Sequence, residues 1–412
     1  MTISLLTVAA AYIYASRQEK TFVNVFTPMF AIMIPTEYLL EIYHVLEFGP
    51  QHSPYAFALS YATYAAYTVG LVFAYTVIRM PLLRLPFDGH SAGRGRLPAY
   101  LLLAGAIALY LPVLIKFRAQ ITDPREIYQE TRVGYGVYFF LSLTLAYLSL
   151  IMLLFAKRAR RLEVGVFVFV CVVFVWLQGS KGHILGFVFI LAMHRVYVAG
   201  RRVSFPKFLT FAFALALFGA LLFLVTTPSL ILNQGINGLA GYSDYTRNGM
   251  KVIDSGIGPF YGKLTLQNQL YTRIPRAIDP DKPRDFGDFY LAKHFFPDIY
   301  VLHSGAPAFG NGTWFADFGI FALPLQLTAG LLIGMLLKMF KQSTERYRTP
   351  GAFVMLLFAS GIPLIALGQA FLLPESIVIA VFANALFVLR IRQSKLSIRL
   401  SHQLSLPTSE VA

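Results

Sequence analysis

Long apolar runs alternate with short polar connections along most of the chain. Eleven runs of roughly membrane-spanning length lie at about 2–16, 22–47, 54–78, 97–115, 137–156, 164–179, 183–199, 208–227, 313–337, 351–371 and 375–390. A membrane helix needs about 20 mainly apolar residues to cross the hydrocarbon core. The pattern therefore predicts an all-α fold, a polytopic membrane bundle of about eleven transmembrane helices.

One polar interval, 228–312, is far longer than the other connections. It divides the chain into an N-terminal bundle of about eight helices (1–227), a large loop (228–312), C-terminal transmembrane helices (313–392) and a polar tail (393–412). Loops of this length are usually functional or disordered, and the many Tyr and Phe residues here favour order. Within the loop, YGKLTLQNQLYTRI predicts a short amphipathic helix.

Composition supports a membrane protein, because only 13% of the residues are charged and 57% are hydrophobic, against about 25% charged in soluble chains. The net charge of +15 comes largely from basic clusters in the short connections. This pattern is typical of cytoplasmic loops and does not indicate nucleic-acid binding. It places the tail in the cytoplasm and the long loop on the extracytoplasmic side.

No metal or cofactor is predicted from the sequence. The single cysteine, Cys171, lies inside an apolar run and cannot form an intrachain disulfide or a thiolate cluster. No DxD or HExxH motif is present, and Asp279 with Asp281 forms a weak DPD pattern in a basic setting.

The basic part of the long loop is the first candidate site. Arg273, Arg276, Lys282 and Arg284 fall within twelve residues that are stiffened by three prolines, and guanidinium groups bind phosphate oxygens through a planar fork of donors. We expect these residues to bind an anionic ligand, and a lipid carrier with a pyrophosphate head suits the outer face of a bilayer. Two alternatives stay open. The basic residues could anchor the loop to lipid headgroups, or they could have no special role, since the rule that depletes basic residues on the outer side is weak for long loops.

Other polar residues interrupt apolar runs. Lys181 stands in the outer turn WLQGSKGHILGF, where it either contacts a ligand or extends to the interface. Glu37, Glu41 and His44 share one helical face, which either lines a cavity or forms an interfacial polar ring.

Candidate bases follow at the end of the loop. Asp317 lies in FGNGTWFADFG at the start of an apolar run, and His303 precedes it. A loop histidine can act as a base near neutral pH, although most are hydrogen-bonded surface residues.

The whole arrangement resembles the bacterial oligosaccharide repeat-unit polymerases of the Wzy type, which are related to O-antigen ligases. The resemblance rests on the helix pattern, the late outer loop, the Gly-Ser-(basic)-Gly turn at 179–182, and the segments IPRAIDPDKP and FGNGTWFADFG. Two departures are Lys181, where many members have arginine, and Thr313, where a glutamate is frequent.

The resemblance implies that a growing glycan is transferred from polyprenyl pyrophosphate to a new lipid-linked repeat unit at the outer face of the bacterial cytoplasmic (inner) membrane. Such a transfer needs no nucleotide sugar. The alternatives are an O-antigen ligase or other polyprenyl-linked-sugar glycosyltransferase, and a lipid-linked glycan transporter. The expected partners are the lipid-linked oligosaccharide, the bilayer and a chain-length regulator.

Residue roles follow from this implied reaction. The catalytic candidates are Arg276, Arg273, His303, Asp317 and Glu41. The substrate-binding candidates are Lys181, Lys282, Arg284, Arg132, Tyr271 and Trp314, with the two aromatic residues expected to stack on sugar rings.

Overall fold

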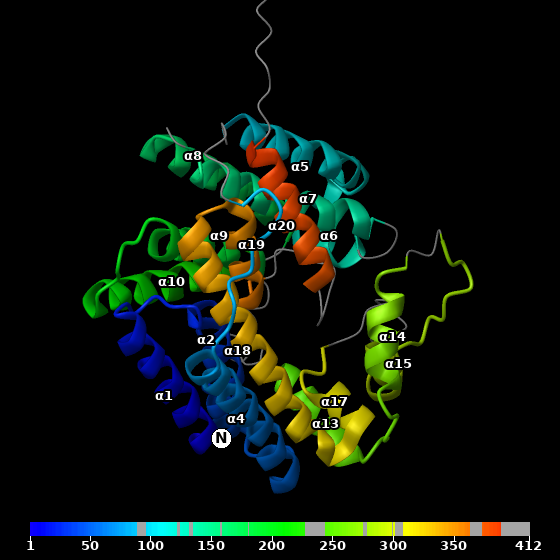
Figure 1. Ribbon diagram of the computed structural model, residues 1–412. Helices are drawn as coiled ribbons and strands as arrows, with labels where there is room; N and C mark the ends of the chain where they lie inside the picture. Colours follow the sequence, from blue (N-terminus) through cyan, green and yellow to red (C-terminus); the bar gives the residue numbers. More distant parts are fainter. Residues whose placement is uncertain are drawn as a thin grey trace, which may run out of the picture.

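The computed structural model describes residues 1–88, 96–121, 124–131, 135–156, 159–179, 181–226, 244–274, 278–298, 300, 308–362 and 373–388. All regular structure in these ranges is helical (Figure 1). The elements before the long loop are α1 (Thr2–Glu19), α2 (Thr27–Met33), η1 (Ile34–Leu39), α3 (Leu40–Phe48), α4 (Pro54–Val77), α5 (Arg96–Lys116), η2 (Arg118–Gln120), α6 (Pro124–Glu130), α7 (Gly136–Leu154), α8 (Arg161–Leu177), α9 (Lys181–Met193), η3 (His194–Val198) and α10 (Phe205–Thr226). The later elements are α13 (Asp244–Ser255), α14 (Lys263–Tyr271), α15 (Asp288–Phe295), α17 (Gly312–Phe318), η5 (Gly319–Phe321), α18 (Ala322–Tyr347), α19 (Pro350–Ala359) and α20 (Leu373–Val388).

Each apolar run predicted from the sequence overlaps at least one of these helices. Five helical segments in the described ranges are long and apolar enough to cross a membrane: Thr27–Phe48, Pro54–Val77, Arg96–Lys116, Gly136–Leu154 and Gly312–Tyr347. The chain is therefore a multi-pass helical membrane protein. The count of about eleven spans stays a prediction, and the tail at 393–412 lies outside the described residues.

The second apolar run is not a regular α-helix. Between α2 and α3 the backbone forms the π-helical turn η1, Ile34–Leu39. Pro35 lies in this turn, and proline lacks the N–H that a continuous α-helix would use. A π-turn inside a helix frequently marks a functional position, and this one carries Glu37.

Helices α4 and α18 pack closely against each other in the bundle. Gly330 and Gly334 on α18 lie directly against the backbone of α4, and Gly70 on α4 lies against α18. A side chain at any of these three positions would overlap backbone atoms of the other helix. Small residues four apart allow this approach, as is common in membrane helix pairs.

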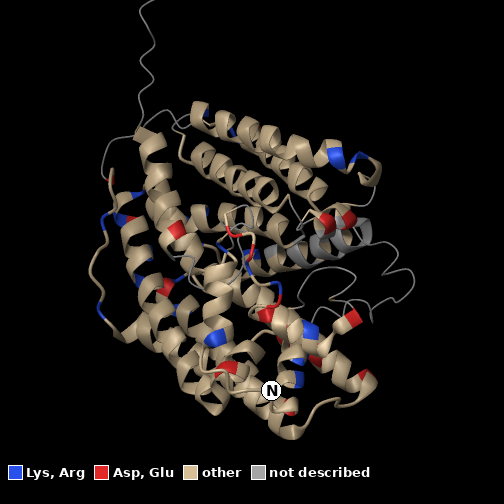
Figure 2. Cartoon of the chain, turned by 90° about the vertical axis from the view of Figure 1, so that its right-hand side faces the viewer, with Lys and Arg blue, Asp and Glu red and all other residues tan. Residues whose placement is uncertain are grey.

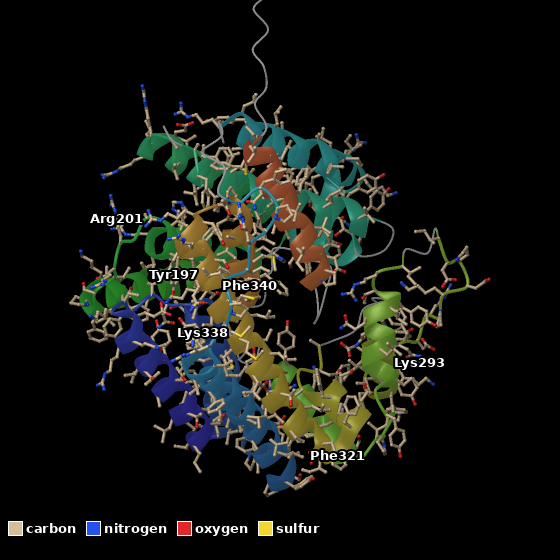
Figure 3. All side chains as sticks on the ribbon, in the orientation of Figure 1. Tyr197, Arg201, Lys293, Phe321, Lys338 and Phe340 are labelled. Carbon is tan, nitrogen blue, oxygen red and sulfur yellow. The ribbon has the colours of Figure 1, made fainter. Side chains whose placement is uncertain are left out.

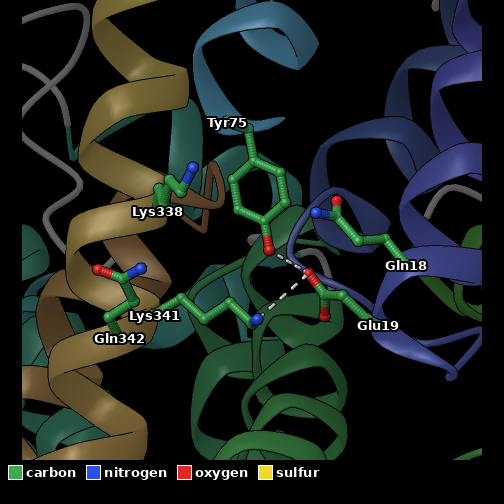
Figure 4. A pocket seen from close by; sticks show the side chains of 6 residues that line it. All are labelled: Gln18, Glu19, Tyr75, Lys338, Lys341 and Gln342. Atoms are coloured by element: carbon green, nitrogen blue, oxygen red, sulfur yellow. Dashed lines mark hydrogen bonds and ion pairs between the residues drawn. The ribbon is translucent and has the colours of Figure 1, made fainter. Parts of the chain in front are cut away.

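One end of this pair holds a buried polar cluster (Figure 4). The carboxylate of Glu19 accepts hydrogen bonds from the hydroxyls of Tyr75 and Tyr197, and the Nζ of Lys341 lies 4.0 Å from it. Lys338 donates to the carbonyl of Ile78 at 2.6 Å. The ends of α1, α4, η3 and α18 thus meet on one side.

Charged residues lie mainly at helix ends and in connections, with long uncharged stretches of helix between them (Figure 2). Side chains such as Phe340 fill the interior, while Arg201 projects from a connection (Figure 3). This distribution suits a bundle whose sides face lipid and whose ends face water.

Candidate functional site

The long loop folds around a small core of its own. Helices α13, α14, α15 and α17 lie together at one end of the molecule (Figure 1). The buried residues of this core are Val252, Leu264, Leu291, Ala292, Phe309 and Ala316. Of these helices, α14 was predicted as a loop helix, at YGKLTLQNQLYTRI, and α17 lies at the start of the predicted span 313–337.

Asp317, a predicted base, caps a helix in this loop. Its side chain is fully buried, and its carboxylate accepts hydrogen bonds from the amides of Leu264 at 2.9 Å and Thr265 at 2.7 Å. These are free N–H groups in the first turn of α14, which a carboxylate can satisfy. Helix α17 ends at Gly319 before α18 begins, so Asp317 precedes α18 and is bound to the loop helix α14.

A second buried network joins three loop helices. The carboxylate of Asp288 accepts a hydrogen bond from the hydroxyl of Thr313 at 2.7 Å and another from the amide of Asn268 at 2.9 Å. Gly287 has a φ of 53°, and a side chain there would overlap Asn268. Thr313 therefore has a partner that fixes α17 against α14 and α15.

The basic segment does not gather its described side chains around one site. The Nε of Arg273 binds Glu375 of α20 at 2.5 Å, and its Nη1 binds the carbonyl of Gln269 at 2.5 Å. Lys282 donates to the carbonyl of Ile274 at 3.0 Å and lies over the ring of Phe286.

Arg284 is exposed beside Asp285. Hydrogen bonds from Lys293 and from the hydroxyl of Tyr300 hold the pKa of that carboxyl below its usual value. Arg276 lies outside the described residues. The described part of the basic segment thus anchors the loop to α20 and to itself.

The remaining predicted residues are placed only in part. The ring of Tyr271 packs on Phe286 at 5.3 Å, and that of Trp314 packs on Phe318 at 6.2 Å. The backbone of Lys181 begins α9, whereas its side chain lies outside the described residues, as do Arg132 and His303. Sugar stacking by the two aromatic residues stays a prediction.

A different part of the loop brings charged residues together. Helix α13 lies over one end of η1, α3 and α4, and we call this contact the loop–bundle seam. Glu37, Glu41 and His44 are all buried there, so their shared face points into the protein and not toward lipid. The Nε of Arg247, on α13, lies 3.7 Å from a carboxylate oxygen of Glu41, and the two side chains are 14% and 3% exposed.

Glu37 receives several donors at the seam. Its carboxylate accepts hydrogen bonds from the hydroxyls of Thr246 on α13 and Tyr64 on α4, the latter at 3.3 Å. Tyr61 donates to the backbone carbonyl of Glu37 at 2.7 Å. A loop helix, a π-turn and α4 therefore share one polar network.

The other end of α13 is fixed as well. The carboxylate of Asp254 accepts hydrogen bonds from the Ser53 hydroxyl at 2.5 Å, the Ser53 amide at 3.2 Å and Nδ1 of His52 at 3.0 Å. Partial burial raises the pKa of Asp254, but the donors on Ser53 and His52 outweigh burial and leave that pKa below its usual value. Helix α13, which carries Arg247, is held at both ends.

Sequence reasoning missed α13 and with it the partner of Glu41. The segment LNQGINGLAGYSDYTRNGMKVIDSGIG looks like a glycine-rich polar loop. A signal was nevertheless present, because Thr246, Gly249 and Met250, which are all buried, follow the i, i+3, i+4 spacing of a helix with one buried face.

Known proteins resemble this chain over nearly its whole length. The O-antigen polymerases of Salmonella typhimurium and Salmonella typhi are each 34% identical to it over 382 residues, covering 92% of this chain and 93% of each relative. The chain belongs to the O-antigen polymerase family. No protein-family model and no solved structure matches it.

The similarity to the O-antigen polymerases includes the loop. An alignment of 382 of the 412 residues leaves too few residues uncovered to omit the long interval 228–312. The matched region therefore includes residues of both the bundle and the loop.

The seam of this O-antigen polymerase family member offers a cation, two carboxylates and a histidine within one buried region. A guanidinium in a site of low polarity can stabilise developing negative charge, and a neighbouring carboxylate or imidazole can accept a proton. Among the described residues, no group of three His, Cys, Asp or Glu side chains is arranged to hold a metal ion.

Proposed function

We propose that this protein polymerises O-antigen by joining lipid-linked repeat units at the outer face of the bacterial cytoplasmic membrane. The observation that carries this proposal is the 34% identity, over 92% of the chain, to proteins named O-antigen polymerase. The multi-pass helical architecture and the large folded loop support it. The substrate is a polyprenyl-pyrophosphate-linked oligosaccharide, and a chain-length regulator is a further proposed partner.

The reaction is a displacement at the anomeric carbon of the growing glycan. A hydroxyl oxygen of the new repeat unit attacks this carbon, and the bond from the carbon to the pyrophosphate oxygen breaks. The hydroxyl proton passes to a base, and polyprenyl pyrophosphate leaves with the electron pair. Catalysis therefore needs positive charge at the leaving group and a base at the acceptor.

We propose that the loop–bundle seam supplies these groups. Arg247 is the cation, because its guanidinium is carried by the loop and is largely buried. Charge interactions are stronger in such a buried site than in water. Glu41 orients Arg247 or acts as the base, and the base role is the one expected from the sequence. His44 lies about one turn beyond Glu41 and is a second candidate base.

The basic loop segment has a supporting role in this proposal. Arg273 is bound to Glu375 and fixes the loop on α20, while Arg284 is exposed and suited to a first encounter with an anionic headgroup. Arg276, Lys181, Arg132 and His303 stay predicted substrate or catalytic residues. Asp317 and Thr313 position the loop helices.

A deletion strain tests the proposed function. Loss of a polymerase leaves a single repeat unit attached to lipid A core, so a gel of surface polysaccharide shows one band where the wild-type gene restores a ladder. A strain with no repeat attached would instead indicate a ligase, and accumulation of precursor on the cytoplasmic side would indicate a transporter.

A further inference from the structure

A cleft between α5 and α8 lies apart from the loop–bundle seam. Both helices pack against α7, and the cleft between them has a volume of about 590 Å³. Its apolar wall includes Leu103, Val166, Phe167 and Val170. Val166 is 56% exposed, as expected of a position that faces lipid and not a protein partner.

Charged residues close one end of this cleft. Arg96 and Arg160 line it together with Glu163, which accepts a hydrogen bond from Arg96 and one at 3.1 Å from the hydroxyl of Tyr100. Two arginines thus line the cleft beside a single carboxylate, so the group has excess positive charge. The Nε of Arg96 is buried and donates to no acceptor among the described residues.

We propose that this cleft binds one anionic phospholipid, with its phosphate at Arg96 and Arg160 and an acyl chain along Val166 and Val170. The apolar wall from Leu162 to Val170 extends about 12 Å along α8, which suits a chain and not a compact solute. Basic pockets between membrane helices on the cytoplasmic side suit anionic headgroups. The basic connections predict that Arg96 and Arg160 lie on that side, opposite the large loop.

The arginines and the apolar wall contribute separately to lipid binding, and separate variants test each contribution. The intact protein is placed in nanodiscs of phosphatidylethanolamine and phosphatidylglycerol, and the lipid that it retains is measured by native mass spectrometry after extraction. Wild type should retain one phosphatidylglycerol. The double variant Arg96→Gln/Arg160→Gln should lose this preference on the order of 30-fold, as expected for two cations near a headgroup.

The matched charge control is Arg201→Gln/Arg202→Gln. It removes the same charge from another connection predicted to be cytoplasmic, where Arg201 projects outward (Figure 3), and it should retain the lipid. The proposal is overturned if Arg96→Gln/Arg160→Gln and Arg201→Gln/Arg202→Gln retain phosphatidylglycerol equally. It is also overturned by equal retention of phosphatidylethanolamine and phosphatidylglycerol by the wild type.

A second variant tests the apolar wall without altering charge. Val166→Trp fills the cleft and should displace the lipid, whereas Phe169→Trp changes an exposed position that does not line the cleft and should not. Lipid retention by Val166→Trp equal to that by Phe169→Trp contradicts the proposed chain position. Because both variants keep all arginines, this comparison holds even if Arg96→Gln/Arg160→Gln fails to fold.

Discussion

Replacing Arg247 by methionine separates a catalytic ion pair from a structural one. In the wild type its guanidinium lies 3.7 Å from Glu41, whose side chain is 3% exposed. Removing one partner of a buried pair costs about 3–5 kcal/mol, because the other charge stays buried and unpaired. Arg247 is still 14% exposed, so we expect a cost near the lower end, about 3 kcal/mol.

The activity loss has a different origin. A positioned donor at the developing negative charge contributes about 2.7–4 kcal/mol, or roughly 100-fold to 1,000-fold in rate. Arg247→Met should therefore abolish the polysaccharide ladder in a deletion strain, beyond any fall in protein amount. Immunoblots of the membrane fraction give the protein amount to which the ladder is normalised.

The double variant Arg247→Met/Glu41→Gln makes the comparison decisive. Replacing both partners of a buried pair by neutral groups is often harmless to stability, so unfolding in detergent should return toward wild type while the ladder stays absent. A double variant with normal stability and a normal ladder would refute the reasoning, because it would show that the pair only holds the fold. Arg201→Met, at an exposed position, is the matched control.

Three further predictions concern the folded loop. Asp317→Ala should destabilise it by about 2 kcal/mol, the upper value for a lost helix cap, and should speed proteolysis of the loop in detergent. Gly287→Ala should cost more than about 1 kcal/mol, because alanine is strained at a φ of 53° and would meet Asn268; thermal unfolding measures this. Hydrogen bonds from Lys293 and Tyr300 lower the pKa of Asp285, so its stabilising contribution is present above the unfolded-state pKa of about 3.9 and is lost as the pH falls through the lowered folded-state pKa. The difference in melting temperature between wild type and Asp285→Asn should therefore shrink at low pH.

Each of these changes has a control that would expose an error. Asp281 is exposed, so proteolysis of Asp281→Ala as fast as that of Asp317→Ala argues against the cap. Gly165 has no atoms near its added side chain, and a loss for Gly165→Ala equal to that for Gly287→Ala argues against the clash. For Asp285, a constant difference from pH 6 to pH 3 contradicts the proposed linkage.

The helices of the bundle were predictable because the bilayer imposes their length and polarity. Apolar runs such as 54–78 and 137–156 correspond to α4 and α7 within about two residues. Hydropathy says nothing of the π-turn at Ile34–Leu39, which depends on Pro35 and on packing. Nor does it show that 313–337 begins with a separate helix, which ends at Gly319.

The site was less predictable, because its contacts join distant parts of the chain. The sequence placed Glu41 on one helical face with Glu37 and His44 and left open whether this face lines a cavity or forms an interfacial polar ring. Its partner, Arg247, lies on α13, about 200 residues later. The basic segment at 273–284 predicts shared phosphate binding, whereas in the structure Arg273 is bound to Glu375, 102 residues away. Local spacing cannot report such pairings, which depend on how the loop packs on the bundle.

Reconstitution tests the central claim most directly. The purified protein is placed in vesicles whose only glycan is one lipid-linked repeat unit, with no nucleotide sugar and no lipid A core, and the products are separated by length. We predict a ladder of two or more repeats that needs Arg247. A single repeat throughout, with longer products only when a nucleotide sugar or lipid A core is added, would contradict the account.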